Sequence, residues 1–266
     1  MSSSAPPRSR REQAETMREL QRTAERLFAE RGLGGVSNRR IVEAAGQANN
    51  SALAYHVGTR IDLVRAIVRS HTAPIARSTQ ERVKAARGST DPHDHVASLV
   101  LPFTEHLATL GTPSWYARFL AQLSTDPAMS AEIHADLRLT PHFQEGLAAA
   151  WSHAPDLPPE EAALRSRMVR LAIVHTCAEQ EATAAATGVP ADWALVGHAL
   201  TDAVAGILLA PGRSPTGSAA GSAPGAAAGS AGPPWPAAGP TGAAAGSAGP
   251  AAGSAGPSGA ATVDAL

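Results

Sequence analysis

The chain has 266 residues, a formal net charge of −1 and 44% hydrophobic residues, which is the balance of an ordinary globular protein. Its single cysteine, Cys177, excludes a disulfide within the chain and a zinc site made only of cysteines. No apolar run approaches the ~20 residues that cross a bilayer, and residues 1–11 lack the apolar core of a signal peptide, so we expect a cytoplasmic protein without a membrane partner.

The charge is distributed unevenly along the chain. Residues 1–70 contain 12 arginines and 7 acidic residues, a net charge of +5, whereas residues 71–210 contain 9 basic and 15 acidic residues, a net charge of −6. We therefore expect only the N-terminal segment to meet a polyanion. Residues 211–266 are almost entirely Ala, Gly, Ser and Pro, which cannot bury enough apolar surface to offset the entropy of ordering, so we interpret them as a disordered tail.

The first strong pattern is a helix predicted over residues 10–31. Its apolar residues recur at spacings of three and four, as expected for one buried face: Met17, Leu20, Ala24, Leu27 and Phe28. Residues 1–9, which precede it, are polar and contain proline, and we predict a flexible arm there.

Residues 37–60 then predict a helix–turn–helix. Ser37 can cap a short helix, and Gly46 stands where a helix needs a left-handed residue to end. Asn49 or Asn50 can cap the following short helix, over residues 51–56, whose small and polar side chains face outward. Thr59 and Asp62 form a capping box that begins the next helix, and the compact unit ends near residue 70.

The sequence of residues 71–210, the body of the protein, predicts further helices and no strands, so the predicted fold class is all-α. Prolines near the predicted helix starts favour these boundaries, whereas Pro102 is expected to kink or split its helix. The predicted ranges are 73–87, 94–110, 113–124, 128–138, 141–153, 159–187 and 191–209. The last two carry long apolar stripes with many alanines, which can bury against the domain's own core or against a second copy. For the pair as a whole we favour a partly intermolecular four-helix bundle in a homodimer.

These features divide the chain into four segments. We predict a flexible arm (1–9), a helix-turn-helix DNA-binding domain (10–70), a helical effector-binding and dimerisation domain (71–210), and the Ala/Gly/Ser/Pro-rich tail (211–266).

The N-terminal unit resembles the tetracycline-repressor-like (TetR) family of bacterial regulators. The matching landmarks are residues 23–32, TAERLFAERG, then Ser37, Ile41 and Ala45-Gly46, and finally residues 53–60, LAYHVGTR. In two places this chain departs from the family: residues 47–51 are one residue longer than the usual turn, and Val57 stands where the family usually has Phe. The resemblance implies a ligand-responsive transcriptional regulator, most often a repressor, that binds a near-palindromic double-stranded DNA operator as a homodimer.

The candidate DNA contacts follow from charge and hydrogen-bonding capacity. Arginines beside a helix start can hold phosphates, and asparagine can pair with adenine in the major groove. Tyr55, His56, Thr59 and Arg60 are expected to touch the phosphate backbone. The full set is Ser37, Arg39, Arg40, Asn49, Asn50, Ser51, Tyr55, His56, Thr59 and Arg60. For Arg39 and Arg40 a solvated helix face is the competing interpretation, and for Asn50 it is a helix cap.

The resemblance also implies an effector pocket in the body, for an uncharged or weakly polar organic molecule of unknown identity. Aromatic and polar residues suited to line it are Phe103, His106, Trp115, Tyr116, Phe119, Trp151, Met168 and His175. Each of these residues is also a candidate for ordinary core packing.

We expect no enzyme activity, no catalytic residues, no metal and no cofactor. His93-Asp94-His95 resembles a metal cluster, but adjacent helical residues cannot face one ion, so a solvated cap is favoured. No nucleophile-elbow or phosphate-loop signature occurs in the part expected to fold. Two alternatives stay open: a small-molecule binding or sequestering protein without specific DNA binding, and a helical enzyme that uses the body pocket.

Overall fold

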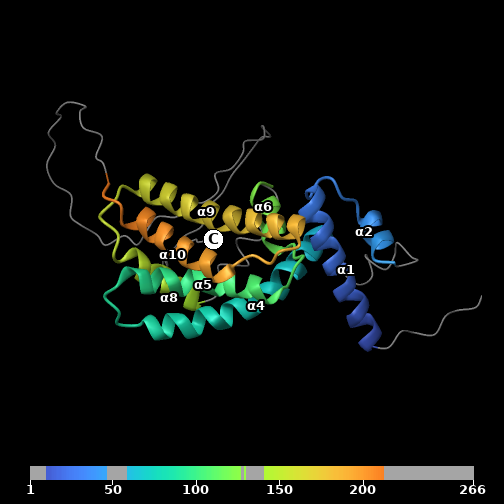
Figure 1. The fold of residues 1–266 in the computed structure, drawn as a ribbon, viewed down its shortest axis with the longest axis horizontal. Coiled ribbons are helices and arrows are strands. Elements are labelled where there is room, and N and C mark those ends of the chain that lie inside the picture. Colours follow the sequence, from blue (N-terminus) through green and yellow to red (C-terminus); the bar gives the residue numbers. More distant parts are fainter. Residues whose placement is uncertain (1–9, 47–58, 127–128, 130–140, 213–266) are drawn as a thin grey trace, which may run out of the picture.

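A computed structural model describes residues 10–46, 59–126, 129 and 141–212 (Figure 1). The helices in these ranges are α1 (Arg10–Arg31), α2 (Asn38–Ala44), α4 (Arg60–Ala86), α5 (Pro92–Thr109), α6 (Tyr116–Ser124), α8 (Pro141–Trp151), α9 (Pro159–Thr187) and α10 (Trp193–Leu209). The described ranges contain no strand, which confirms the all-α prediction for them. The predicted arm, the helix over 51–56, nearly all of the helix over 128–138 and all but two residues of the tail lie outside the described residues.

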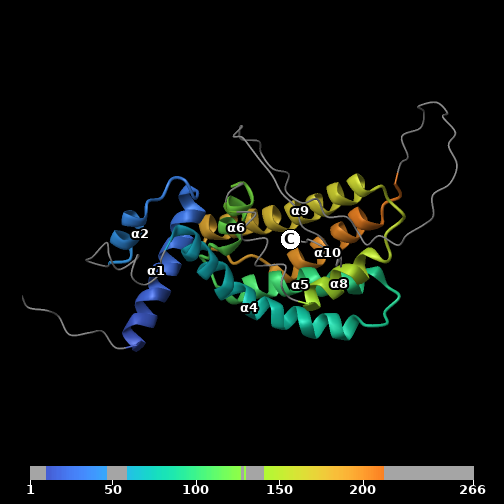
Figure 2. The same cartoon turned by 180° about the vertical axis from the view of Figure 1, so that it is seen from behind.

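The molecule is elongated, with α1 and α2 at one end and the body helices at the other, as Figures 1 and 2 show from opposite sides. Within the body, α5 packs against α4, α8 and α10, while α9 packs against α6 and α10. The N-terminal end is joined to the body by α4 and by contacts between α1 and α6. Buried apolar side chains form one cluster that extends from α1 to α10, so the core has no break at residue 70.

The structure confirms the helix, the cap and the turn residue predicted for α1 and α2. Helix α1 spans the predicted residues, and its side chains Leu20 and Phe28 are buried. The hydroxyl of Ser37 accepts a hydrogen bond from the Arg40 amide at 3.2 Å, which is the expected helix cap. Gly46 has a φ of 67°, the left-handed conformation that ends this helix and that only glycine adopts without strain.

Helix α4 begins at the predicted capping box, in which Thr59 and Asp62 each satisfy an amide of the other. The prediction of a separate helix from residue 73 is wrong, because α4 continues through Pro74 to Ala86. A proline inside a helix costs about 3 kcal/mol. Buried side chains on both sides of it, such as Ile67 and Val83, offset that cost by packing into the core.

Helix α5 is also continuous through its proline, Pro102, so the helix is not split there. It begins at Asp91, whose carboxylate accepts the amide of His93 at 2.8 Å. The prediction of a solvated cap for the neighbouring histidines fails for His95. That ring is buried, lies 3.0 Å from the Ser89 carbonyl through Nε2, and stacks on His153.

Helix α6 has no capping side chain of its own at its first residues. Instead, Glu181 of α9 accepts hydrogen bonds from the Arg118 amide at 2.9 Å and from the Ser114 hydroxyl at 2.8 Å. The Glu181 side chain is 1% exposed, and burial raises its pKa, against the opposing effect of these hydrogen bonds. This single carboxylate therefore caps α6 from another helix and ties it to α9.

We predict that Glu181→Ala lowers the free energy of unfolding by about 3–5 kcal/mol, because removing one member of a buried charged network leaves its partners unsatisfied. Urea denaturation measures the loss. Glu179→Ala is the matched control: Glu179 is exposed on the same helix, and its removal should leave the unfolding midpoint unchanged. Equal midpoints for the two variants would contradict the capping role of Glu181.

Candidate nucleic-acid interface and internal cavity

The exposed face of α2 presents two adjacent arginines. Arg39 Nε lies 2.7 Å from Glu43 Oε1, one turn along the same helix, and both side chains are exposed. That partner raises the pKa of Arg39, so the guanidinium is fully charged but partly offset by its neighbour. Arg40 is exposed as well. Arg40 is therefore the better placed of the two to meet a phosphate.

Thr59 is engaged by its own helix cap. Its amide donates to Asp62 Oδ2 at 2.9 Å, and its hydroxyl lies 2.6 Å from the same oxygen. These hydrogen bonds lower the pKa of Asp62, which stays ionised at neutral pH. The Thr59 side chain thus caps α4, and a phosphate would have to compete with the Asp62 carboxylate for the Thr59 hydroxyl.

The Arg60 side chain turns into the protein rather than outward. Its guanidinium donates to the carbonyls of Val36, at 2.6 Å, and Leu33, and its centre lies 4.9 Å from the centroid of the Phe28 ring. Burial lowers the pKa of Arg60, although the group stays charged. The predicted phosphate contact at Arg60 has a competing use, because the guanidinium already holds the loop between α1 and α2.

The remaining predicted DNA contacts lie outside the described residues. They are the base-reading candidates Asn49, Asn50 and Ser51 and the backbone candidates Tyr55 and His56. Both family departures, the longer turn at 47–51 and Val57, fall in the same undescribed stretch.

Four of the predicted pocket residues gather where α1, α4, α5 and α6 meet. Tyr116 and Phe119 are buried, and their ring centroids lie 6.4 Å apart. Phe103 and His106 lie edge-on to Tyr116, at 6.2 and 6.0 Å. They pack against each other, and Trp115, partly buried, is the residue before the first turn of α6. The structure thus brings these side chains together as core at the joint between the two ends of the molecule.

Met168 and His175 do not line the interior. Both side chains are exposed on α9, Met168 with 47% of its surface. The apolar stripe predicted for this helix is therefore only partly buried, because Met168 and His175 face away from the body.

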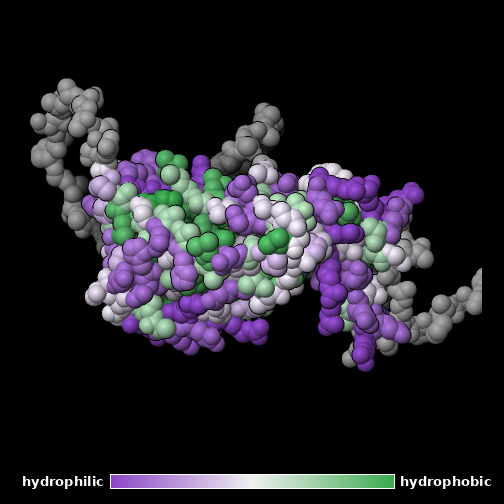
Figure 3. Space-filling model, viewed as in Figure 1, coloured by the Kyte–Doolittle hydropathy of each residue, from purple (hydrophilic) through white to green (hydrophobic). Residues whose placement is uncertain are grey.

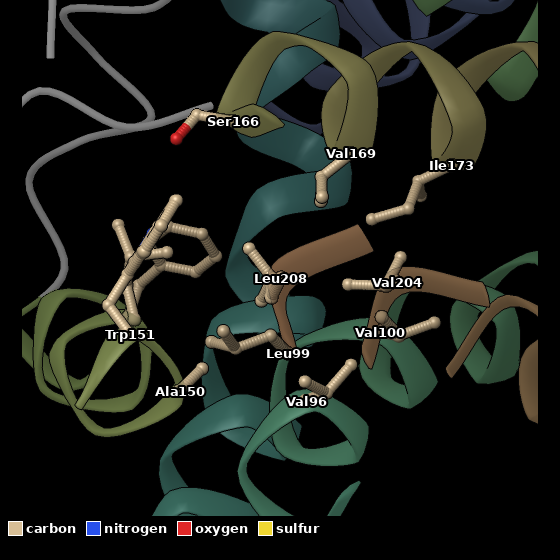
Figure 4. A pocket seen from close by; sticks show the side chains of 12 residues that line it. Val96, Leu99, Val100, Ala150, Trp151, Ser166, Val169, Ile173, Val204 and Leu208 are labelled. Carbon is tan, nitrogen blue, oxygen red and sulfur yellow. The ribbon is translucent and has the colours of Figure 1, made fainter. Parts of the chain in front are cut away.

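An apolar cavity of ≈ 50 Å³ lies between α5, α8, α9 and α10 (Figure 4). Trp151, at the end of α8, is the one predicted pocket residue that lines it. The lining residues are Val96, Leu99, Val100, Phe143, Leu147, Ala150, Trp151, Ser166, Val169, Ile173, Val204 and Leu208. The Ser166 hydroxyl donates to the Ala162 carbonyl at 3.0 Å and can still accept a hydrogen bond. Aliphatic residues, the main component of this wall, carry no chemical signal that separates pocket from core in a sequence.

An apolar patch covers α9, α10 and the turn between them, and it is visible as the green area over these helices in Figure 3. Among the described residues, every large hydrophobic side chain that is exposed lies on α9, on α10 or in the turn between them: Leu164, Met168, Leu171, Val189 and Leu195. Exposed small residues continue the same surface along α10, namely Ala199, Ala203 and Gly206. Clustered apolar exposure of this kind marks interaction surfaces in soluble proteins.

Two other kinds of site are missing from the part of the chain that the structure describes. No group of His, Cys, Asp or Glu side chains there could hold a metal ion. None of the helices described is long and apolar enough to cross a membrane.

No protein-family model and no curated protein matches this chain. Solved structures that are similar to it in fold include two transcriptional regulators. One is a TetR family transcriptional regulator, PfmR, from Thermus thermophilus, with 17% identity and a TM-score of 0.46 over 74% of this chain and 97% of that one. The other is a transcriptional regulator from Rhodococcus sp. Rha1, with 18% identity and a TM-score of 0.41 over 72% of this chain and 95% of that one.

We predict that Arg60→Ala lowers the free energy of unfolding by about 1–3 kcal/mol, because the carbonyls of Leu33 and Val36 lose their donor. Arg40→Ala, an exposed arginine in the same unit, should leave unfolding unchanged. Urea denaturation followed by circular dichroism compares the two variants. If both unfold at the wild-type midpoint, Arg60 does not hold the α1–α2 loop.

Proposed function

We propose that the chain is a ligand-responsive, DNA-binding transcriptional regulator, a repressor, that binds a near-palindromic operator as a cytoplasmic homodimer. The observation that carries the proposal is the start of a helix–turn–helix, with Ser37, Gly46 and the Thr59 capping box in the expected conformations, inside the one basic segment of the chain.

The electrostatics support DNA as the partner of this end of the molecule. The exposed arginines of α2 belong to a segment of net charge +5, and the body carries a net charge of −6. A polyanion is therefore attracted to one end and repelled by the other, which orients the protein on DNA. Base reading is assigned to residues 49–51 and backbone contacts to Tyr55 and His56, as the sequence predicts.

The apolar patch on α9 and α10 supports a homodimer. Leu164, Met168 and Leu171 are spaced by four and three residues, so they stand on one face of α9. The small residues of α10 allow a second helix pair to approach closely, and two copies of α9 and α10 would form a four-helix bundle. A second copy is the occupant we favour, because two half-sites of DNA need two recognition helices.

The cavity beside Trp151 supports a small apolar effector. Its present volume of ≈ 50 Å³ is far below the ~300–1,000 Å³ of sites for drug-sized ligands, so a larger molecule has to displace part of the wall. The partly buried Trp151, at the end of α8, is suited to that movement. Regulation requires that the effector bind the DNA-incompetent geometry more tightly than the DNA-competent one.

The same cavity also fits the alternative of a small-molecule binding protein that reads no DNA. A mobility-shift assay with the DNA upstream of the protein's own gene separates the two. A retarded band at low salt that persists against unrelated competitor DNA supports the regulator. Absence of any band at low salt would leave the binding protein as the better interpretation.

We predict that Arg40→Ala weakens binding to operator and unrelated DNA alike, and lowers the slope of log affinity against log salt by about 0.9 if one phosphate contact is lost. Fluorescence anisotropy at several salt concentrations gives both quantities. Glu43→Gln, which frees Arg39 from its ion pair, should act in the opposite direction. An unchanged salt slope in Arg40→Ala would remove this residue from the interface.

We predict that Met168→Glu converts the homodimer to a monomer, because it places a charge in the centre of the apolar patch. Sedimentation velocity measures the oligomeric state, and circular dichroism checks that the helices remain. Ala85→Glu adds the same charge on an exposed position of α4, away from the patch, and should stay dimeric. A dimeric Met168→Glu variant would place the dimer interface elsewhere.

A further inference from the structure

Three titratable side chains from three helices form a hydrogen-bonded chain at the joint between α1 and the body. Glu25 of α1 lies with Oε2 3.0 Å from Nε2 of His71, on α4. His71 Nδ1 lies in turn 2.8 Å from Nε2 of His106, on α5. The Glu25 and His71 side chains are only 11% and 12% exposed, so the chain is largely shielded from water.

Tyr116 of α6 closes the remaining side of this cluster. Its ring stacks on His71 at a centroid distance of 3.8 Å and lies edge-on to His106. Burial, together with the charge of Glu25, raises the pKa of Tyr116, so the phenol stays neutral. The groups that face the histidine pair are therefore the Glu25 carboxylate from α1 and this neutral phenol from α6.

The hydrogen bonds between Glu25, His71 and His106 limit how many protons the three side chains can carry. With both imidazoles neutral, the Glu25 carboxylate requires a proton on His71 Nε2, so His71 Nδ1 accepts from a proton on His106 Nε2. One added proton is accommodated: His71 then donates through both nitrogens, and His106 accepts at Nε2 and carries its proton on Nδ1. A second added proton is not accommodated, because two N–H groups would face each other across 2.8 Å.

This limit distinguishes His106 from an ordinary histidine. Burial and the charge of His71 lower the pKa of His106 from 6.5 to about 4. A local opening that exposes His106 to water and separates it from His71 removes both causes and raises the pKa of His106 toward its ordinary value. The open form therefore gains protons relative to the closed form as the pH falls from about 6.5 toward about 4, and acid favours opening in that window.

We propose that Glu25, His71 and His106 form a proton-sensitive latch that holds the DNA-binding end of the molecule to the body and is released by acid. The three side chains come from α1, α4 and α5. Opening the His71–His106 contact therefore separates α5 from α4 and α1, which stay joined through Glu25 and His71. The contacts and the proton count of the latch follow from geometry, the pH window of its release follows from the lowered pKa of His106, and its effect on operator affinity rests on the proposed function.

His106→Gln tests the latch, because the glutamine amide can donate to His71 Nδ1 from the place of Nε2 and does not titrate. The wild type should lose thermal stability more steeply than His106→Gln as the pH falls from about 6.5 toward about 4. His198→Gln, an exposed histidine of α10, should follow the wild type. Parallel curves for wild type and His106→Gln would overturn the proposal.

The ring nitrogens give a second readout that involves no unfolding. In ¹⁵N spectra of the histidine side chains, acidification should move the His106 proton from Nε2 to Nδ1 before His106 becomes an imidazolium. Independent titration of both rings, each with an ordinary histidine profile, would overturn the proton count.

Operator binding separates failure of the latch from failure of the proposed function. Between about pH 7.5 and pH 5, the wild type should lose operator affinity on the order of tenfold more than His106→Gln does. If the wild type binds no DNA at about pH 7.5, the proposed function fails, while the stability and ¹⁵N measurements still decide the latch. If it binds, and both proteins respond equally to acid, the latch is wrong and the function stands.

Discussion

The buried carboxylate of Glu181 sets the position of α6, and with it the relation between the two ends of the molecule. A carboxylate without water is costly unless donors surround it, and those donors are the Arg118 amide in the first turn of α6 and the hydroxyl of Ser114, just before that helix. These hydrogen bonds hold the start of α6 against α9. Helix α6 also contacts α1, so a contact inside the body helps to position the N-terminal helix.

Two ties therefore run between the basic end and the acidic body. One is covalent: α4 begins at the Thr59 cap and ends at Ala86 among the body helices. The other consists of side chains, where Phe28 of α1 stacks on Phe119 of α6, and Glu25 reaches His71 and then His106. If α4 were the only tie, any displacement of one end of the molecule would pass along this helix to the other end. In the proposed latch this second tie opens and closes, and the proposed regulator uses these two arrangements as the alternatives between which a ligand or a proton chooses.

The predicted site residues separate into groups for reasons that their chemistry explains. The exposure of the arginines of α2 could be predicted from the local sequence pattern, since the cap and the apolar residues of a short helix define which face points outward. Arg60 looks the same in sequence, yet its long side chain reaches back to the carbonyls of Leu33 and Val36. Of the aromatic residues expected to line a pocket, only Trp151 lines the cavity, which is walled mainly by aliphatic side chains, whereas Phe103, Tyr116 and Phe119 form the joint. His71 carries no signal in the sequence, because a lone histidine within a helix shows its partners on α1 and α5 only after the chain has folded.

Short-range information determined the helices by itself. The stripe of α1, the Ser37 cap, the left-handed Gly46, the Thr59–Asp62 box and the full extent of α9 all follow from interactions within about four residues along the chain. Tertiary packing decided what such rules do not contain: that α4 and α5 continue through Pro74 and Pro102, that Met168 faces outward, and that Glu25, His71 and His106 meet. A proline's local cost is overruled when buried side chains on both sides are held by other helices, and partners 46 and 35 residues apart become neighbours only through the fold.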